Sequence, residues 1–120
     1  MQRLLWIMAF IILPNLASAY YETGRELLQN CESSEAPRWA LCRGYLTGIA
    51  DSIDTARAEY TEDADHPFFP TFTNVCRPDD VTRGKLVKTW IEWANRHPEM
   101  LRRSAVDLVV TAFSEAWPCN

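Results

Sequence analysis

Residues 37–56 read PRWALCRGYLTGIADSIDTA, and this stretch decides the fold class. Its apolar side chains recur at steps of three and four residues, a spacing that places them on one face of an α-helix. The stripe consists of Trp39, Cys42, Leu46, Ile49, Ile53 and Ala56, and Leu41 and Tyr45 widen it. Pro37 suits the first turn of this helix, because a proline there costs no intrahelical hydrogen bond. We therefore predict a long amphipathic helix that begins near residue 37.

Gly44 and Gly48 lie four residues apart on one face of the same predicted helix. A glycine inside a helix costs ~1 kcal/mol relative to alanine. Two such costs indicate that a neighbouring helix packs closely against this face. The alternative interpretation is that the helix simply tolerates both glycines.

Helical patterns also flank this stretch on both sides. Thr23 and Glu26 have the spacing of a capping box, which predicts a helix over 23–30. Another helix is expected to begin at Asp80 or Thr82. Its apolar stripe consists of Leu86, Trp90, Ile91 and Ala94.

The last predicted helix begins at Ser104, whose partner Asp107 fits the capping pattern, and it ends before Pro118. No alternating pattern of useful length predicts a β-strand. The expected fold is therefore all-α, a small disulfide-stapled bundle of about four helices in an up-down antiparallel arrangement.

The first nineteen residues have the pattern of a cleavable export signal. Arg3 gives a positive start, ten apolar residues follow, and Ala-Ser-Ala at 17–19 offers small residues to a signal peptidase. The apolar run is too short to span a bilayer, which needs ~20 residues. A membrane anchor and a buried helix are the alternative interpretations. We predict a signal peptide over 1–19 with cleavage after Ala19, export from the cytosol, and one mature domain over 20–120.

Four cysteines remain after cleavage, and an even number in an exported chain predicts two disulfides. A zinc site is the alternative, but zinc ribbons and fingers need ligands two to four residues apart, and the four cysteines are widely spaced. Sequence alone allows three pairings. The up-down arrangement favours Cys31 with Cys42 at one end of the bundle and Cys76 with Cys119 at the other.

The charge of the chain excludes several kinds of partner. The chain has 12 basic and 16 acidic side chains, a net charge of −4. Loss of the signal removes Arg3 and no acidic residue, so the mature domain carries −5. We therefore expect no nucleic-acid binding and, after signal cleavage, no membrane binding.

No arrangement of catalytic side chains can be recognised in the sequence. The two histidines, His66 and His97, each lie beside a proline, and the predicted disulfides leave no free thiol. Asp51 and Asp54 share a helix face and could perform acid–base chemistry or hold a cation, although a solvated helix face is the more common interpretation. His97 is interpreted as a helix-end histidine near the last carbonyls. We expect no enzyme activity, no cofactor and no metal, and hence a binding protein.

The expected binding surface is the polar loop after the third helix, together with the exposed side of that helix. Loops held by rigid helices commonly carry function, and tryptophan and arginine are favoured at protein contacts. The candidate residues are Trp93, Arg96, His97, Pro98, Glu99, Met100, Leu101 and Arg102. The alternative for Trp93 is a place in the core. The loop over 61–74 contains three phenylalanines, which we expect to pack back onto the bundle.

Several short motifs occur in a fixed order along the mature chain. They are Cys31, the run LCRGYLTG over 41–48 followed by Asp51, Cys76-Arg77-Pro78, Val81-Thr82 with Leu86, His97-Pro98-Glu99, and Trp117-Pro118-Cys119. In this set the chain resembles the Rap/Tai family of periplasmic immunity proteins, which neutralise peptidoglycan amidase effectors of type VI secretion systems. The stretch before Cys76 is longer and richer in proline and phenylalanine than the linker expected from that family.

The resemblance implies an all-helical fold, a periplasmic address and a homodimer. It also implies that a protruding loop, matched here by His97-Pro98-Glu99 within residues 96–102, enters the active-site groove of a secreted cell-wall amidase. Two other hypotheses remain: a general periplasmic helical binding or acid-stress chaperone-like protein without a toxin partner, and an enzyme.

Overall fold

The computed structural model describes residues 21–60 and 74–120. The elements in these ranges are α1 (Gly24–Cys31), α2 (Ala36–Tyr60), α4 (Arg83–Arg96), the short 3-10 helix η1 (Pro98–Met100) and α5 (Ala105–Ala116). Within these ranges the only β-type pairing is two isolated bridges, so the predicted all-α class is confirmed. None of the described helices has the length and apolar character that crossing a membrane requires. The predicted signal peptide and the three phenylalanines of the loop over 61–74 lie outside the described residues.

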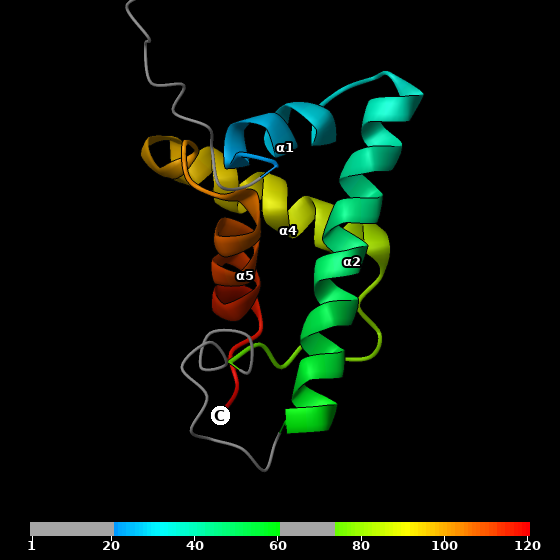
Figure 1. Cartoon of the computed structure of the whole chain (residues 1–120), viewed down its shortest axis with the longest axis vertical. Helices are drawn as coiled ribbons and strands as arrows, with labels where there is room; N and C mark the ends of the chain where they lie inside the picture. The colour runs from blue at the N-terminus through cyan, green and yellow to red at the C-terminus, as the bar shows by residue number, and fades with distance from the viewer. Residues whose placement is uncertain (1–20, 61–73) are drawn as a thin grey trace, which may run out of the picture.

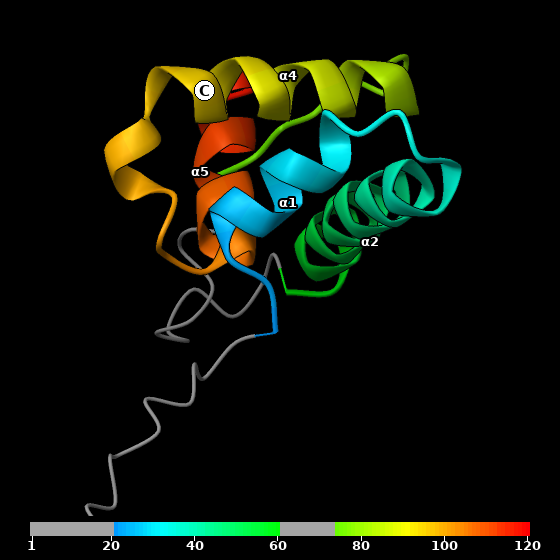
Figure 2. The same cartoon turned by 90° about the horizontal axis from the view of Figure 1, so that it is seen from above.

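The helices cross one another instead of forming the expected up-down bundle. In Figure 1, α2 and α5 stand upright and run in the same direction, whereas α1 and α4 lie across them. Figure 2, seen from above, shows α4 running along one side of the molecule, past both α5 and α2. The reason lies in the unequal lengths, since the eight residues of α1 span about 12 Å and the 25 residues of α2 about 37 Å. A helix as short as α1 covers only one end of α2.

The core forms where the predicted stripe of α2 meets α4 and α5. Cys42, Leu46 and Ile53 are almost completely buried, as are Trp90 of α4 and Phe113 of α5. Burial of large apolar side chains is the main favourable term in the stability of a domain of this size. The long helix predicted from residues 37–56 therefore supplies one wall of the core.

Two residues predicted to belong to the buried stripe of α2 are exposed. Trp39 is 40% exposed and Leu41 is 49% exposed. Both lie in the first two turns of α2, to the side of the line formed by Cys42, Leu46 and Ile53. The other helices cover that line and leave the flanks of α2 open.

The prediction that a neighbouring helix packs against Gly44 and Gly48 is wrong within the described chain. Both glycines are exposed, and a Cβ atom added at either position would meet no atom within 4 Å. They lie on the side of α2 opposite the core, because Leu46 and Ile53 point inward. The two glycines therefore serve no packing contact among the described residues.

The predicted start of α1 is confirmed by its hydrogen bonds. The Glu26 backbone N–H donates to Thr23 Oγ1 at 3.2 Å, and the Thr23 backbone N–H donates to Glu26 Oε2 at 2.8 Å. Asp80 and Thr82 are the two proposed N-caps of α4. Thr82 is the N-cap, and its side-chain oxygen accepts a hydrogen bond from the Lys85 backbone N–H.

The capping box predicted at Ser104 does not form. Ser104 is the N-cap of α5, but its side chain accepts no capping hydrogen bond. Its backbone pairs instead with Thr23 in an isolated bridge, and the neighbouring Ala105 N–H donates to the Glu22 carbonyl at 3.0 Å. The segment before α1 therefore satisfies a free N–H group at the start of α5.

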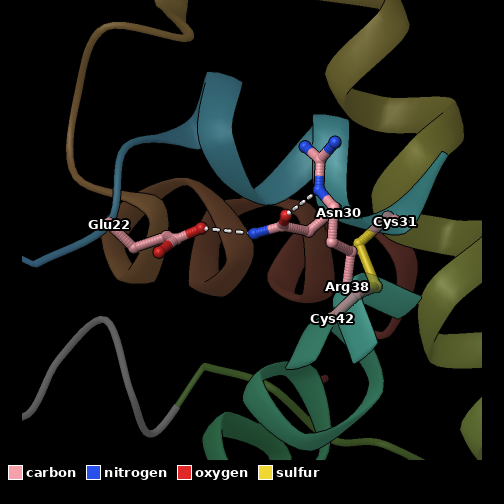
Figure 3. The surroundings of a disulfide bond; sticks show 5 residues. All are labelled: Glu22, Asn30, Cys31, Arg38 and Cys42. Atoms are coloured by element: carbon pink, nitrogen blue, oxygen red, sulfur yellow. Dashed lines mark hydrogen bonds between the residues drawn. A yellow bond between two sulfur atoms is a disulfide. The ribbon is translucent and has the colours of Figure 1, made fainter. Parts of the chain in front are cut away.

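Both predicted disulfides are present. Cys31–Cys42 joins the end of α1 to α2, and Cys76–Cys119 joins the segment before α4 to the chain after α5. Figure 3 shows a hydrogen-bonded chain beside the first disulfide, in which Asn30 donates to Glu22 and accepts from Arg38, each at 3.0 Å. Polar contacts and a covalent bond thus fix the same end of α1.

Removal of each disulfide tests its contribution to stability. The loops closed by Cys31–Cys42 and Cys76–Cys119 span 11 and 43 residues. The loop-entropy model predicts losses of about 3 and about 4 kcal/mol in the free energy of unfolding for the two paired Cys→Ser variants. Urea unfolding followed by circular dichroism measures both. Equal stability of either variant and the wild type would contradict the prediction.

The capping box predicts a pH dependence of stability. Hydrogen bonds from the Thr23 backbone N–H and hydroxyl hold the pKa of Glu26 below its ordinary value. A lowered carboxyl pKa stabilises the fold above the unfolded pKa, and this contribution is lost as pH falls through the lower folded value. Glu26→Gln should therefore be less stable than wild type at pH 7, and the difference should shrink below about pH 4.

Urea unfolding at several pH values measures this difference. The matched control is Glu26→Gln in a Thr23→Ala background, where the hydrogen-bond partner is already altered. There the pH-dependent difference should be smaller. A difference of the same size in both backgrounds would show that the Thr23 hydroxyl makes no contribution, because Thr23→Ala keeps the backbone N–H that also donates to Glu26.

Candidate functional site

The loop over 96–102 follows α4 and leads towards α5. Arg96 ends α4, and η1 then forms a single turn that projects beyond the end of α5 (Figures 1 and 2). Within the loop over 96–102, four side chains are exposed, and His97 and Met100 are half-buried. The exposed ones are Arg96, Pro98, Glu99 and Arg102. The loop therefore presents two basic groups and one acidic group to solvent.

The start of α1 fastens the far side of this loop. The Gly24 N–H donates to the Arg103 carbonyl at 3.0 Å, and the Arg25 N–H donates to the Leu101 carbonyl at 2.9 Å. A Cβ atom on residue 24 would lie 2.5 Å from Leu108 Cδ1, which is too close for the two atoms to coexist without a shift. Glycine at position 24 thus permits the close approach that these hydrogen bonds need.

Two of the predicted contact residues are not available to a partner. Trp93 is 2% exposed and Leu101 is 5% exposed, so both belong to the core. Their apolar side chains face inward because the loop and α4 are held against α5 and α1. The structure therefore keeps six of the eight predicted residues at the surface, fully or in part.

Trp93 instead contacts the loop from the core through its stacking on His97. Its Nε1–H donates to Glu115 Oε2 at 2.8 Å, and its ring stacks on the His97 imidazole with centroids 4.2 Å apart. His97 Nδ1 lies 2.8 Å from the Trp93 carbonyl oxygen, which agrees with the prediction of a helix-end histidine. We call Glu115, Trp93 and His97 the indole brace. It connects α5 through α4 to His97, the second residue of the loop.

Sequence reasoning missed Glu115. The Trp93–Glu115 hydrogen bond joins residues 22 positions apart on different helices. Neither periodicity nor a motif links them, since an exposed glutamate near the end of a helix is ordinary. Only the packing of α4 against α5 brings the carboxylate to the indole.

A groove of about 380 Å³ runs beside the brace between α4 and α5. Lys85 and Arg96 supply positive charge to its lining, and Glu92 and Glu115 supply negative charge. Trp117 adds a half-buried aromatic surface at one side. The groove begins at Arg96, so it continues the exposed surface of the loop over 96–102.

The arrangement is suited to contact with a protein surface. Asp54 forms an ion pair with Arg77, which leaves Asp51 and Asp54 in different environments. No cluster of three or more potential metal ligands occurs among the described residues. The loop over 96–102 itself contains no nucleophile paired with a base. A loop with exposed charges beside a groove is suited to the outer part of a protein interface, because that part is polar and accessible to solvent.

Truncation of Glu115 tests the indole brace. Glu115→Ala removes the acceptor of the Trp93 indole, so we expect a loss of about 1–2 kcal/mol in stability and faster amide hydrogen exchange in residues 97–103. Glu115→Gln keeps an acceptor oxygen and should be intermediate. Hydrogen exchange measured by mass spectrometry reports the loop directly.

The matched control is Glu92→Ala, which removes the other carboxylate of the groove lining and leaves the Trp93–Glu115 hydrogen bond in place. The Glu92 carboxylate lies 3.8 Å from the Lys88 ammonium, and both side chains are exposed, so the pair contributes little. Equal exchange of residues 97–103 in the Glu115 and Glu92 variants would contradict a specific role of the brace.

Comparison with known proteins gives one family. The family model described as Rap1a immunity proteins matches residues 23–119. No curated protein and no solved structure matches the chain. The matched range includes all the described helices, both disulfides and the loop over 96–102.

Proposed function

Since the chain belongs to the family of Rap1a immunity proteins, we propose that it is a periplasmic immunity protein that binds and inhibits a peptidoglycan amidase effector of a type VI secretion system. The observation that carries the proposal is the exposed loop over 96–102, held rigidly on a framework that the family model covers. An immunity protein must bind its effector tightly, and a loop that is ordered before binding loses little conformational entropy on association.

We infer that the loop inhibits by occupying the active-site groove of the amidase. Glu99 lies in η1 and is exposed, with Arg96 and Arg102 on either side. The indole brace and the hydrogen bonds to α1 support this loop from two directions. Substrate could not enter a groove filled by such a loop, so no chemical step by the immunity protein is needed.

The periplasmic address is part of the same proposal. A signal peptide over 1–19, cleaved after Ala19, would deliver the chain to the compartment that contains peptidoglycan. Two disulfides suit that oxidising compartment, because cytosolic thiols are kept reduced. We also propose that the chain forms a homodimer, as its resemblance to Rap/Tai proteins implies.

Charge reversal in the loop tests the inhibitory contact. Glu99→Arg should raise the dissociation constant for the amidase by about 30-fold or more, because the central residue of a contact loop is a candidate hot spot worth ~2 kcal/mol. The probes are purified type VI amidase effectors, including any encoded beside this gene. Calorimetry measures binding, and release of peptidoglycan fragments measures inhibition.

Asp79→Arg is the matched control, because it makes the same charge change in an exposed turn before α4. This variant should bind and inhibit like the wild type. Wild-type affinity of Glu99→Arg would place the contact elsewhere. If the wild-type chain neither binds an amidase nor protects a bacterial host that expresses one in its periplasm, the proposed function is wrong.

A further inference from the structure

The outer face of α2 is left without a partner by the rest of the described chain. It carries Ala40, Gly44, Gly48 and Asp51, all exposed, and the half-buried Thr47. In Figures 1 and 2, α2 stands at the edge of the molecule. A solvent-facing helix surface normally carries charged and polar side chains, whereas this one is composed mostly of small residues.

A shallow hollow of about 440 Å³ lies along this face. Trp39 and Arg43 form one side, with the Arg43 guanidinium 4.5 Å above the Trp39 ring, and Arg83 at the start of α4 forms another. Three large apolar side chains are exposed in the described residues, and two of them, Trp39 and Leu41, lie in the first two turns of α2. Exposed apolar side chains therefore lie close to Gly44 and Gly48, where no side chain covers the helix backbone.

The charges on this face are arranged symmetrically along the helix. Arg43 precedes Thr47 by four residues, and Asp51 follows it by four residues. If a second α2 lay antiparallel on the first with a two-fold axis at Thr47, each Arg43 would face the other copy's Asp51. An isologous interface requires this kind of self-complementarity.

We propose that a second copy of this chain packs its α2 antiparallel on this face, crossing at Thr47 and pairing each Arg43 with the opposite Asp51. Gly44 and Gly48 then allow the two helix backbones to approach closely, and Trp39 and Leu41 of each copy cover the opposite helix. The proposal rests on the homodimer included in the proposed function and names its surface.

Charge complementarity favours a second copy over a different protein. An acidic partner would complement Arg43 and Arg83 but would be repelled by Asp51. A basic partner would complement Asp51 but would face two arginines. A copy of the same face satisfies both signs at once, and within the described chain neither Asp51 nor Arg83 has an ion-pair partner.

The first experiment measures the mass of the mature chain by sedimentation over a range of concentrations. Gly48→Gln is the steric variant, because a side chain at residue 48 meets nothing within 4 Å in the monomer but would hold a second helix away. Glutamine also favours helix over glycine, so the variant should fold at least as well as wild type. We expect a dimer for wild type and a monomer for Gly48→Gln.

The second experiment uses the symmetry of the charges. Asp51→Arg places like charges opposite one another twice and should weaken the dimer about tenfold. The double variant Arg43→Glu/Asp51→Arg restores opposite charges and should recover most of that loss. The matched control is Lys88→Glu/Glu92→Lys, which exchanges an exposed pair on α4 and should leave the dimer unchanged.

Recovery of the dimer in the double variant, with loss in Gly48→Gln, supports the antiparallel contact. A wild-type chain that is monomeric at all concentrations overturns both the contact and the homodimer. A stable dimer that Gly48→Gln and Asp51→Arg leave unchanged overturns the contact alone. None of these measurements contains an amidase, so failure here is separate from failure of the inhibitory function.

Discussion

The disulfide between Cys31 and Cys42 fixes the helix on which the candidate site depends. α1 has only eight residues, and a helix of that length is not stable in water without tertiary support. Its last residue is bound covalently to α2, and its first residues donate hydrogen bonds to the carbonyls of Leu101 and Arg103. The position of the loop over 96–102 therefore depends on a bond at the opposite end of α1.

Some residues of the loop over 96–102 hold it against the helices, and others are exposed and can contact a partner. Leu101 is buried against α1, and the half-buried His97 rests on Trp93, which Glu115 holds through the indole N–H. The exposed Glu99 lies between these two anchors. A loop anchored on both sides keeps its charged groups in one arrangement, and such preorganisation favours tight and specific binding. This is the physical basis for regarding a short turn as the contact element of an immunity protein.

The long helix α2 has two faces with different chemistry. One face carries Cys42, Leu46 and Ile53 into the core, and the opposite face carries two glycines that contact nothing within 4 Å. Each glycine costs the helix ~1 kcal/mol, a cost that packing within the described chain does not offset. A contact with a second copy gives those glycines a structural role. The dimer face and the loop over 96–102 lie on different helices, so one subunit can use both.

The sequence by itself determined the helical class, the starts of α1 and α2, the expectation of two disulfides and the loop that follows α4. These features depend on local periodicity, on caps such as Thr23 with Glu26, and on cysteine spacing within a compact helical chain. Only the tertiary structure decided which flank of α2 is covered, that Trp93 and Leu101 are buried, and that Glu115 meets the Trp93 indole. Burial and pairing between helices depend on crossing angles and on unequal helix lengths, and a one-dimensional pattern contains neither.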